Sequence, residues 1–593
     1  MNPLRLALLL TSWSSIAHAV TFHVSPQPLS GIPADQQFRT IQDAANVVSA
    51  GDIVLIHSGV YRETVVVEKN GTRERPIRFE AAAVSNVVVT GLDPLRDWHK
   101  ESDNSYSTPW PYRFIPWSKT EAHPDDEYHR LIGRAEQVVS SSQLLRQTLQ
   151  RDQLSPGSFY VDLTNKRLYV SSATGEKLNA SGVEIGASTR SLLWRCKGAY
   201  VTLRGIRFRY AANEAQQGGV IFEGRGDVAE DCIFERMNAT GVGFIGPDQV
   251  ARHCTFQDNG EVGFAGYRTH NLLVTDCTFR NNNTKGFDHQ WEAGGTKIVL
   301  SRGVILEKSR FVANHGPGVW FDIGNENSTV RNCLIADNED AGIFYEISYG
   351  LNAHDNVVIG NGFANDPRAW GGQAGIVLSS SPNCVITRNL LIGNREGFNF
   401  REQARITSRI DNRDEQQQEQ VWNHDERVCN NVIAYNRDAQ SRGWFGVSDQ
   451  RHWPRKLQEA KPEGAAAPVD GISLEALRLD LSHNVYGRDD NQPLFIWGTS
   501  WLRHIDYSTI SSIQSELNLE RGSVVSPINF SSYAARDFRL PADSTVFRLK
   551  CYPHGEVPDV RLGKLKTAAG NREKSREGRS RTLTSRGPHR QHR

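Results

Sequence analysis

Three stretches in the middle of the sequence repeat one another: DCIFERMNATGVGF from Asp231, HCTFQDNGEVGF from His253 and DCTFRNNNTKGF from Asp276. The second residue of each stretch is a cysteine, and these cysteines stand 22 and 23 residues apart. Each stretch has the pattern of short alternating strands separated by Asn, Asp and Gly turns, with no helical period between them. Such a repeat is typical of a right-handed parallel β-helix, in which each copy forms one rung of a stack.

The repeat continues in both chemistry and spacing beyond these stretches. Further copies begin at Lys308, Asn332, Asn356 and Asn389, and the longer gaps between some of them indicate inserted loops. We expect the small Cys and Ser side chains of the first strand to point inward as a stack and not to form disulfides. We expect a second series, at the turns of the rungs, to stack its side-chain amides on neighbouring backbone. The members of this second series are Asn332, Asn356, Asn389, Asn431 and Asn484.

Length and composition agree with an all-β chain. The 593 residues are 38% hydrophobic, with 50 Gly and only 2 Met, which excludes a mini-protein and a wholly disordered chain. The net charge of +1 conceals a basic tail, because the residues from Lys564 onward contain ten Lys or Arg and two Asp or Glu. The remaining chain is mildly acidic, and we expect no nucleic-acid partner.

The N-terminal residues predict export. Arg5 is followed by an apolar stretch and then by Ala17-His18-Ala19, which is the pattern of a cleaved secretory signal. No later stretch has the roughly 20 apolar residues that a membrane span needs, so we expect a secreted or periplasmic protein. The eight cysteines lack CxxC spacing, and we expect no metal site built on them.

Breaks in the repeat divide the chain. The fold class that we predict is all-β, a right-handed parallel β-helix with an inserted small β-rich module. The predicted segments are a signal peptide (1–19), an N-terminal cap with the first rungs (20–99), an inserted β-sandwich-like module (100–190), the main parallel β-helix (191–440), a C-terminal β-rich segment (441–562) and a disordered basic tail (563–593).

Chemistry in such a fold must come from outward side chains that lie in register across rungs. In GVWFDIG and GIFYEIS, alternation points the apolar residues inward and leaves Asp322 and Glu346 outward, at the same place on neighbouring rungs. On the same face we expect Asp288 and Gln290 before this pair. After it we expect Ser379, Asn399 and Arg401.

The predicted spacing of the two carboxyls suggests a mechanism. Parallel neighbours are about 4.8 Å apart, so the two groups would lie roughly 5 Å from each other and one would keep its proton near neutral pH. This separation is what a retaining glycosidase needs. It suggests Asp322 as the nucleophile and Glu346 as the general acid and then the general base. The plainer alternative is that both are solvated surface groups or bind a cation.

Aromatic side chains crowd the same predicted face, and exposed rings beside polar groups suit the apolar faces of sugars. Arg401 would pair with a carboxylate or bind an acidic group of the substrate. The aromatic candidates for substrate binding are Trp291, Trp320, Phe344, Tyr349 and Trp370.

The sequence resembles exported right-handed β-helix proteins of carbohydrate metabolism, and most closely the β-helix glycoside hydrolases of the β-xylosidase type. The resemblance rests on GPGVWFDIGN (316–325), AGIFYEISYG (341–350), GDIVLIHSGVYRETV (51–65) and GSFYVDLTNKRLYV (157–170), and it covers residues 20 to 540 approximately. Those enzymes carry a β-sandwich inserted between rungs. They use an Asp and a Glu from successive rungs in a retaining mechanism without a cofactor, which this resemblance carries onto Asp322 and Glu346.

Two alternatives remain. Polysaccharide lyases and epimerases share the fold and need a base to abstract a proton next to a uronate carboxyl; Arg401 or Lys297 would serve, with Ca²⁺ held by Asp288, Asp322 and Glu346. The third class is a non-catalytic protein that binds glycans. In all three classes the expected partner is a carbohydrate polymer or oligosaccharide.

Overall fold

The computed structural model describes residues 19–84, 86–102, 104–114, 131–172, 184–364, 372–402, 405–411, 418–445, 477–488, 492–499, 504–551, 560–561 and 564–565. Almost all of the predicted signal peptide, Trp370 and nearly the whole predicted basic tail lie outside these residues.

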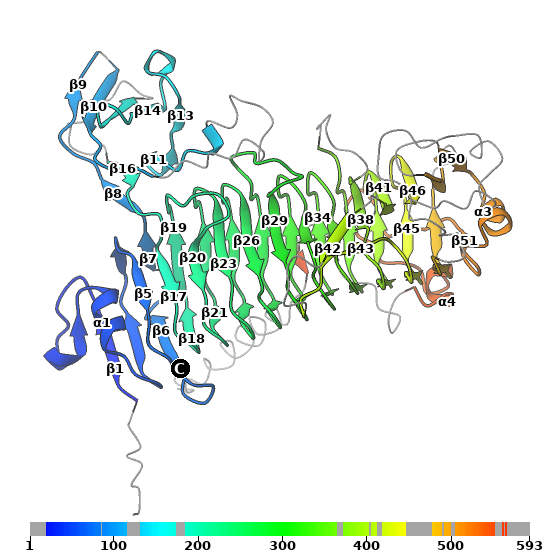
Figure 1. The fold of residues 1–593 in the computed structure, drawn as a ribbon, viewed down its shortest axis with the longest axis horizontal. Coiled ribbons are helices and arrows are strands. Elements are labelled where there is room, and N and C mark those ends of the chain that lie inside the picture. The colour runs from blue at the N-terminus through cyan, green and yellow to red at the C-terminus, as the bar shows by residue number, and fades with distance from the viewer. Residues whose placement is uncertain are drawn as a thin grey trace, which may run out of the picture.

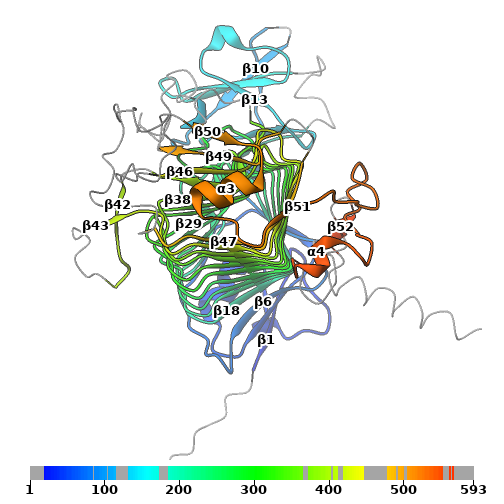
Figure 2. The same ribbon diagram turned by 90° about the vertical axis from the view of Figure 1, so that its right-hand side faces the viewer.

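Three long sheets, here called A, B and C, run the length of an elongated stack (Figure 1). Each full rung gives one strand to each sheet in turn, and almost all neighbouring strands are parallel. Viewed along the stack, the rungs superimpose around one interior (Figure 2). The predicted all-β fold, a right-handed parallel β-helix, is confirmed.

Sheet A shows plain alternation along its short strands. The middle residue points into the stack, as Ala251, Val274 and Leu306 do, and its two neighbours are partly exposed. In spatial order its strands are β2 (Gln37–Phe38), β1 (Thr21–Val24), β3 (Ile53–Ile56), β6 (Ile77–Ala81), β18 (Val201–Arg204), β21 (Val228–Glu230), β24 (Val250–Arg252), β27 (Leu273–Thr275), β30 (Ile305–Glu307), β33 (Thr329–Arg331), β36 (Asn352–His354), β39 (Val385–Thr387), β44 (Arg427–Cys429) and β47 (Asp480–Ser482).

Sheet B places a column of phenylalanines in the core. Neighbouring rings of Phe208, Phe234, Phe256, Phe279 and Phe311 stack with centroids 4.5 to 5.3 Å apart, close to the rung spacing. The strands of sheet B are β4 (Gly59–Tyr61), β7 (Val87–Thr90), β19 (Ile206–Arg209), β22 (Ile233–Glu235), β25 (Thr255–Gln257), β28 (Thr278–Arg280), β31 (Arg310–Val312), β34 (Leu334–Ala336), β37 (Val357–Ile359), β40 (Leu390–Ile392), β45 (Val432–Ala434), β48 (Val485–Gly487) and β51 (Val524–Val525).

Sheet C differs because the outer face of its middle strands is also buried. Every residue of β32, β35, β38 and β41 is buried, so other parts of the chain cover this face. The strands of sheet C are β5 (Val65–Val67), β17 (Trp194–Cys196), β20 (Gly218–Phe222), β23 (Thr240–Phe244), β26 (Val262–Tyr267), β29 (Gly294–Val299), β32 (Val319–Asp322), β35 (Ile343–Glu346), β38 (Ala374–Ser379), β41 (Glu396–Arg401), β46 (Ala439–Phe445), β49 (Phe495–Thr499) and β50 (His504–Tyr507).

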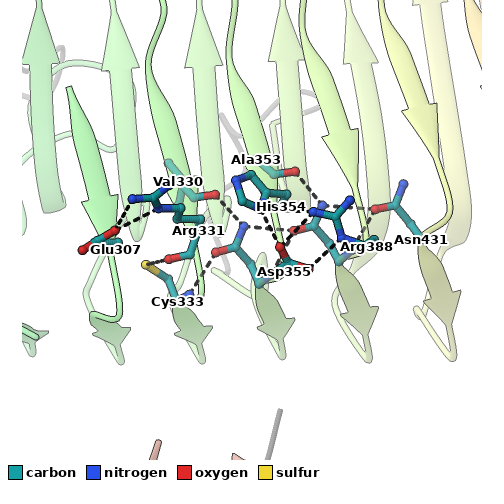
Figure 3. Close-up of polar contacts among 11 residues, drawn as sticks. Glu307, Val330, Arg331, Cys333, Ala353, His354, Asp355, Arg388 and Asn431 are labelled. Carbon is teal, nitrogen blue, oxygen red and sulfur yellow. Dashed lines mark hydrogen bonds and ion pairs between the residues drawn. The ribbon is translucent and has the colours of Figure 1, made fainter. Parts of the chain in front are cut away.

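A buried polar ladder joins the rungs at the turn between sheets A and B (Figure 3). Asn356 accepts from the backbone N–H of Cys333 and donates to the oxygens of Val330 and Asn389, at 2.8 to 3.0 Å. The predicted Cys and Asn series are thus two halves of one ladder, and all eight cysteines are free and buried, as expected. The prediction was wrong for Asn332, which is not a member of this buried series. Asn332 precedes Cys333 in a left-handed turn with φ 53° and is exposed.

A second asparagine ladder, which the sequence analysis did not identify, lines the turn between sheets B and C. Each side-chain amide donates to the oxygen of the next, as Asn314 does to Asn338 at 2.9 Å. Together the two ladders satisfy backbone groups that the turns would otherwise leave unpaired inside the stack. The members of the second ladder are Asn259, Asn282, Asn314, Asn338, Asn361, Asn394 and Asn436.

A small β module is inserted between two neighbouring rungs without breaking the ladder. The chain leaves the stack after β7 and returns at β17, yet β6 pairs directly with β18 and β7 with β19. The module projects from the N-terminal part of the stack (Figure 1). One of its sheets contains β13 (Arg146–Thr148), β14 (Ser158–Asp162), β15 (Arg167–Ser171), β10 (Ser105–Pro109) and β9 (His99–Lys100), and the other β12 (Gln143–Leu144), β11 (Val138–Ser140), β16 (Ile185–Ser188) and β8 (Leu92–Pro94).

Short helices cover the two ends of the stack. Helix α1 (Ile41–Val47) lies at the first rungs, and the hydroxyl of Thr40 accepts from the N–H of Asp43 at its start. At the other end one more rung follows residue 440, and α3 (Ile510–Leu517) covers it (Figure 2). None of the described helices is long and apolar enough to cross a membrane.

The remaining elements are short. A hairpin of β42 (Arg405–Ser408) and β43 (Gln418–Val421) projects on the side of sheet C (Figure 2). The others are η1 (Ala34–Gln36), η3 (Arg151–Gln153), α4 (Thr545–Arg548), β52 (Val560–Arg561) and β53 (Lys564–Leu565).

Candidate active site

Two carboxyl side chains end neighbouring strands on the outer face of sheet C. The last residue of β32 is Asp322 and the last residue of β35 is Glu346. The register pairs Trp320 with Phe344 and Phe321 with Tyr345, which sets Asp322 beside Glu346 on the next rung. Since parallel strands are about 4.8 Å apart, the two backbones are separated by about one rung. The placement agrees with the register predicted from alternation.

Lys297 connects Asp322 to a third acid. Its ammonium Nζ lies 3.2 Å from Asp322 Oδ2 and 3.2 Å from Glu292 Oε2. Nζ also donates to the carbonyl oxygen of Trp291. Burial lowers the pKa of Lys297, but the charges of Glu292 and Asp322 outweigh burial and raise the pKa above its ordinary value. Lys297 therefore remains an ammonium ion, which lies between the carboxyl groups of Glu292 and Asp322.

Glu346 has different surroundings. Its Oε1 accepts from Arg405 Nη1 at 2.9 Å, across from the β42–β43 hairpin. Burial, and then the neighbouring charge of Asp322, raise the pKa of Glu346 above its ordinary value, and the nearby cations offset this only in part. Two carboxyls in equivalent places thus differ, because Asp322 is paired with a buried ammonium and the pKa of Glu346 is raised.

One oxygen of the Asp322 carboxyl has no partner among the residues that the structure describes. Oδ1 is buried and makes no hydrogen bond to any residue in the described part of the chain, although Oδ2 is paired with Lys297. A buried carboxylate oxygen that is desolvated and unpaired is costly for stability. Such a group is typical of a functional site, where the oxygen has a role beyond the fold.

Trp320 and Phe344 lie on the same face but are not exposed, which corrects the expected exposed rings. Trp320 is 1% exposed and Phe344 is 6% exposed. The rings stack on each other with centroids 5.3 Å apart, and Lys297 Nζ lies 4.1 Å from the centroid of Trp320. The Trp320 ring, which is itself stacked on Phe344, therefore packs against the Lys297 ammonium and helps to hold it in place.

Arg401 follows Glu346 two rungs later, with Ser379 between them in the same row. Its guanidinium lies 5.5 Å from the centroid of Phe344. Burial lowers the pKa of Arg401 to about 10, against the opposing charges of Glu346 and Asp340. The predicted position of Arg401 on this face is correct.

Asp288 does not occupy the predicted row, which is a second correction. Residues 284–293 form turns and not a strand, and the strand of that rung, β29, begins at Gly294. Lys297 stands opposite Trp320, and Val299 stands opposite Asp322. The Asp288 carboxyl instead accepts from the backbone N–H of Gln290 at 2.9 Å, within the turn.

Trp291 and Tyr349 lie at opposite ends of the face. Trp291 stacks on Phe287 at 6.0 Å and meets the site through its carbonyl oxygen. Tyr349 follows sheet C and has the guanidinium of Arg409 4.1 Å from its ring centroid. Arg409 in turn donates to Glu326 at 2.9 Å, which anchors the β42–β43 hairpin to the stack.

Arg405, Glu292 and Glu261 were not among the predicted site residues. Glu292 lies in the turn before β29, and Glu261 immediately precedes β26, where it accepts from Thr240 Oγ1 at 2.8 Å. Burial, and then the charge of Glu292, raise the pKa of Glu261 well above its ordinary value. No residue period marks these positions, although a charged residue directly before a buried strand was a usable signal for Glu261.

The described residues contain no group of three or more His, Cys, Asp or Glu side chains arranged to hold a metal ion. The Ca²⁺ ligands expected for a lyase, Asp288, Asp322 and Glu346, do not form such a group. The acids at this face are balanced by Lys297, Arg401 and Arg405.

A family model and one solved structure support the fold, and a second solved structure aligns more weakly. The family model described as "Right handed beta helix region" matches residues 191–290 and 218–391. The solved structure "The complex structure of XylC with xylose" aligns with a TM-score of 0.57 and 14% identity, over 82% of this chain and 86% of that chain. The structure of "a mannuronic acid specific polysaccharide family 6 lyase enzyme from human gut microbiota" aligns with a TM-score of 0.41 and 13% identity, over 81% and 87%.

A curated relative matches a short segment only. "Uncharacterized protein YwoF" of Bacillus subtilis (strain 168) is 39% identical over 57 residues, which are 10% of this chain and 12% of that protein. The chain therefore has a right-handed β-helix fold, which it shares with a protein solved in complex with xylose. Likeness at 14% identity shows the fold alone, so the activity must be argued from the side chains.

Proposed function

We propose that this protein is a glycoside hydrolase that cleaves a plant or algal polysaccharide or oligosaccharide with retention of configuration. The observation that carries the proposal is the contrast between two adjacent carboxyls. Asp322 is paired with a buried ammonium, whereas the pKa of Glu346 is raised by burial and by the charge of Asp322. A retaining glycosidase needs an ionised nucleophile beside a protonated acid, and the contrast supports these roles for Asp322 and Glu346.

In the first step, an Asp322 carboxylate oxygen attacks the anomeric carbon while the bond from that carbon to the leaving oxygen breaks. Glu346 gives its proton to the leaving oxygen, and a covalent glycosyl ester forms on Asp322. In the second step, Glu346 takes a proton from water, the water oxygen attacks the same carbon, and Asp322 leaves as a carboxylate. Oδ1 of Asp322 is the better candidate for the attacking oxygen because Oδ2 is paired with Lys297.

Lys297 acts as a positioning residue in this proposal. It fixes Asp322 by an ion pair and is fixed by Glu292, by the carbonyl oxygen of Trp291 and by the face of Trp320. Arg401 and Arg405 would contact substrate hydroxyl or carboxyl groups beside Glu346. No cofactor is needed for either step. The pattern of residues 5–19 supports the further proposal that the protein is secreted or periplasmic.

The test measures hydrolysis of a panel of aryl glycosides and identifies the first-formed anomer by NMR. We expect the product to keep the configuration of the substrate. In Glu346→Gln, the rate of hydrolysis should fall most for substrates with a poor leaving group. The first step should remain fast for activated dinitrophenyl glycosides, because their leaving group needs no proton. Inverted product would contradict the assignment of Asp322 as nucleophile.

A second candidate, a polysaccharide lyase or epimerase, is favoured by the lowered pKa of Arg401, about 10. A lower pKa leaves a larger fraction of Arg401 as the neutral guanidine, which is the form that can abstract a proton next to a uronate carboxyl. Lys297 is a poor base here because its pKa is raised. New ultraviolet absorbance of unsaturated uronates, absent in Arg401→Lys but present in Asp322→Asn, would favour the lyase. Binding of glycans without any turnover would favour a non-catalytic protein.

A further inference from the structure

A row of outward side chains continues from the two carboxyls toward the N-terminal end of the stack. The register of sheet C pairs Asp322 with Val299, and Val299 with Tyr267. The register of β23 and β26 places Ile245 next in the same line. Neighbouring members of the line are one rung apart, so Tyr267 lies two rungs, or about 10 Å, from Asp322.

This row changes character along its length. Asp322 and Glu346 are buried, whereas Tyr267 is 49% exposed and Ile245 is 40% exposed. Ile323, which directly follows Asp322, is 39% exposed. Single apolar side chains at a surface need no explanation, but Ile245 and Tyr267 lie on neighbouring rungs, in the row that leads through Val299 to Asp322. With the partly exposed Val299 between Tyr267 and Asp322, these side chains form an apolar strip that ends at the candidate site.

Tyr267 has the chemistry of a sugar platform. Its hydroxyl accepts from Arg268 Nε at 3.2 Å, and the Arg268 guanidinium carbon lies 5.6 Å from the ring centroid. These contacts fix the ring while half of the side chain remains accessible. A tyrosine ring offers an apolar face to the C–H face of a sugar, and its hydroxyl offers a polar edge.

We infer that the substrate is an extended oligosaccharide chain, which runs along this strip from the Asp322 and Glu346 pair and stacks one sugar ring on Tyr267. The inference rests on the proposed function and specifies that the substrate is several sugars long. A single sugar bound at the carboxyls would not reach Tyr267, which is about 10 Å away, whereas a chain of about three sugars would. Longer substrates should therefore gain rate through contacts at a distance from the reacting bond.

The experiment compares hydrolysis of a single-sugar aryl glycoside with that of oligosaccharides of increasing length, all of the sugar that the wild-type protein cleaves. Tyr267→Ala should lower kcat/KM about tenfold for the longer chains and leave the single-sugar substrate unchanged. Tyr267→Phe should keep most of the rate, because it keeps the ring. Phe363→Ala is the matched control, since Phe363 is 44% exposed with Arg437 5.1 Å from its ring and lies outside this row.

Equal rates of Tyr267→Ala and wild type on every chain length would overturn the inference and leave the hydrolase proposal intact. If no glycoside is cleaved by the wild-type protein, the hydrolase proposal fails. Calorimetric binding of xylo- and manno-oligosaccharides to the Glu346→Gln protein then tests separately whether the strip binds an oligosaccharide chain. Binding that is weakened by Tyr267→Ala and not by Phe363→Ala supports it, and binding that is unchanged or undetectable overturns it.

Discussion

Two sets of charged side chains lie on neighbouring rungs of this stack: Asp355 with His354 and Arg388 at the edge of sheet A, and Asp322 with Glu346 on sheet C. The pKa of Asp355 and the pKa of Glu346 shift in opposite directions. At the edge of sheet A, Asp355 is bound by His354 at 2.5 Å and by Arg388 at 2.9 and 3.0 Å (Figure 3). Burial raises the pKa of Asp355, but these bonds outweigh it and lower the pKa below its ordinary value. On sheet C, burial and a neighbouring acid raise the pKa of Glu346.

The comparison distinguishes Asp355, whose charge stabilises the fold, from Asp322 and Glu346, whose arrangement costs stability. Both oxygens of Asp355 are paired, so its ionised form stabilises the stack. At Asp322 one buried oxygen has no partner among the described residues, and at Glu346 burial and the neighbouring acid raise the pKa. An arrangement that costs stability on a regular scaffold is typical of a site selected for chemistry.

The largest expected difference between the two sets is the effect of substitutions on catalytic activity. Asp322→Asn and Glu346→Gln should each lower kcat/KM on an unactivated glycoside by about a thousandfold or more, because they remove the nucleophile and the proton donor. Asp355→Asn should stay within about twofold of wild type, since it is distant in register from the reacting groups. Comparable losses in all three variants, measured on well-folded protein, would contradict the distinction.

Stability should move in opposite directions in the two sets. Asp355→Asn should lower the free energy of unfolding by about 1 to 3 kcal/mol at pH 7, because charge-assisted hydrogen bonds are lost. Glu346→Gln should raise it by about 1 kcal/mol, because the neutral amide resembles the protonated form that burial favours. Denaturant unfolding at pH 7 measures both.

The pH dependence gives the sign of each effect. The pKa of Asp355 is lowered from 3.8, so its contribution is present above that value and is lost as the pH falls. The pKa of Glu346 is raised from 4.5, so the folded state holds more protons and wild type loses stability relative to Glu346→Gln as the pH rises above 4.5. A stabilising effect of Glu346→Gln that grew toward acid pH would reverse the assignment.

The repeat predicted the fold because a β-helix is nearly one-dimensional, and each rung carries the same alternation as its neighbours. For the same reason the places of Asp322, Glu346 and Arg401 follow from local sequence. Where a rung departs from the repeat, the prediction was wrong. Asp288 lies in a run of turns, and Lys297 and Val299 take the outward places of that rung, opposite Trp320 and Asp322.

Burial of the site could not be predicted from the rungs. Trp320 and Phe344 are outward in the alternation, but other parts of the chain cover them. Arg405 approaches Glu346 from a hairpin 59 residues further along the chain, and no periodic signal links the two. Contacts of this kind depend on loop conformation, which a repeat pattern does not encode.

The contact between Arg405 and Glu346 gives the smallest expected effect and the most specific test of the role of Glu346. Arg405 favours the ionised form of Glu346, so Arg405→Met should raise the pKa of Glu346 and move the alkaline limb of the kcat/KM profile to higher pH, by about one unit or less. Arg409→Met is the matched control, because Arg409 anchors the same hairpin to Glu326. If the limb moves equally in both variants, the hairpin position and not the charge is responsible. If it moves to lower pH in Arg405→Met, Glu346 does not act as the acid, since removing a neighbouring cation can only strengthen its hold on the proton.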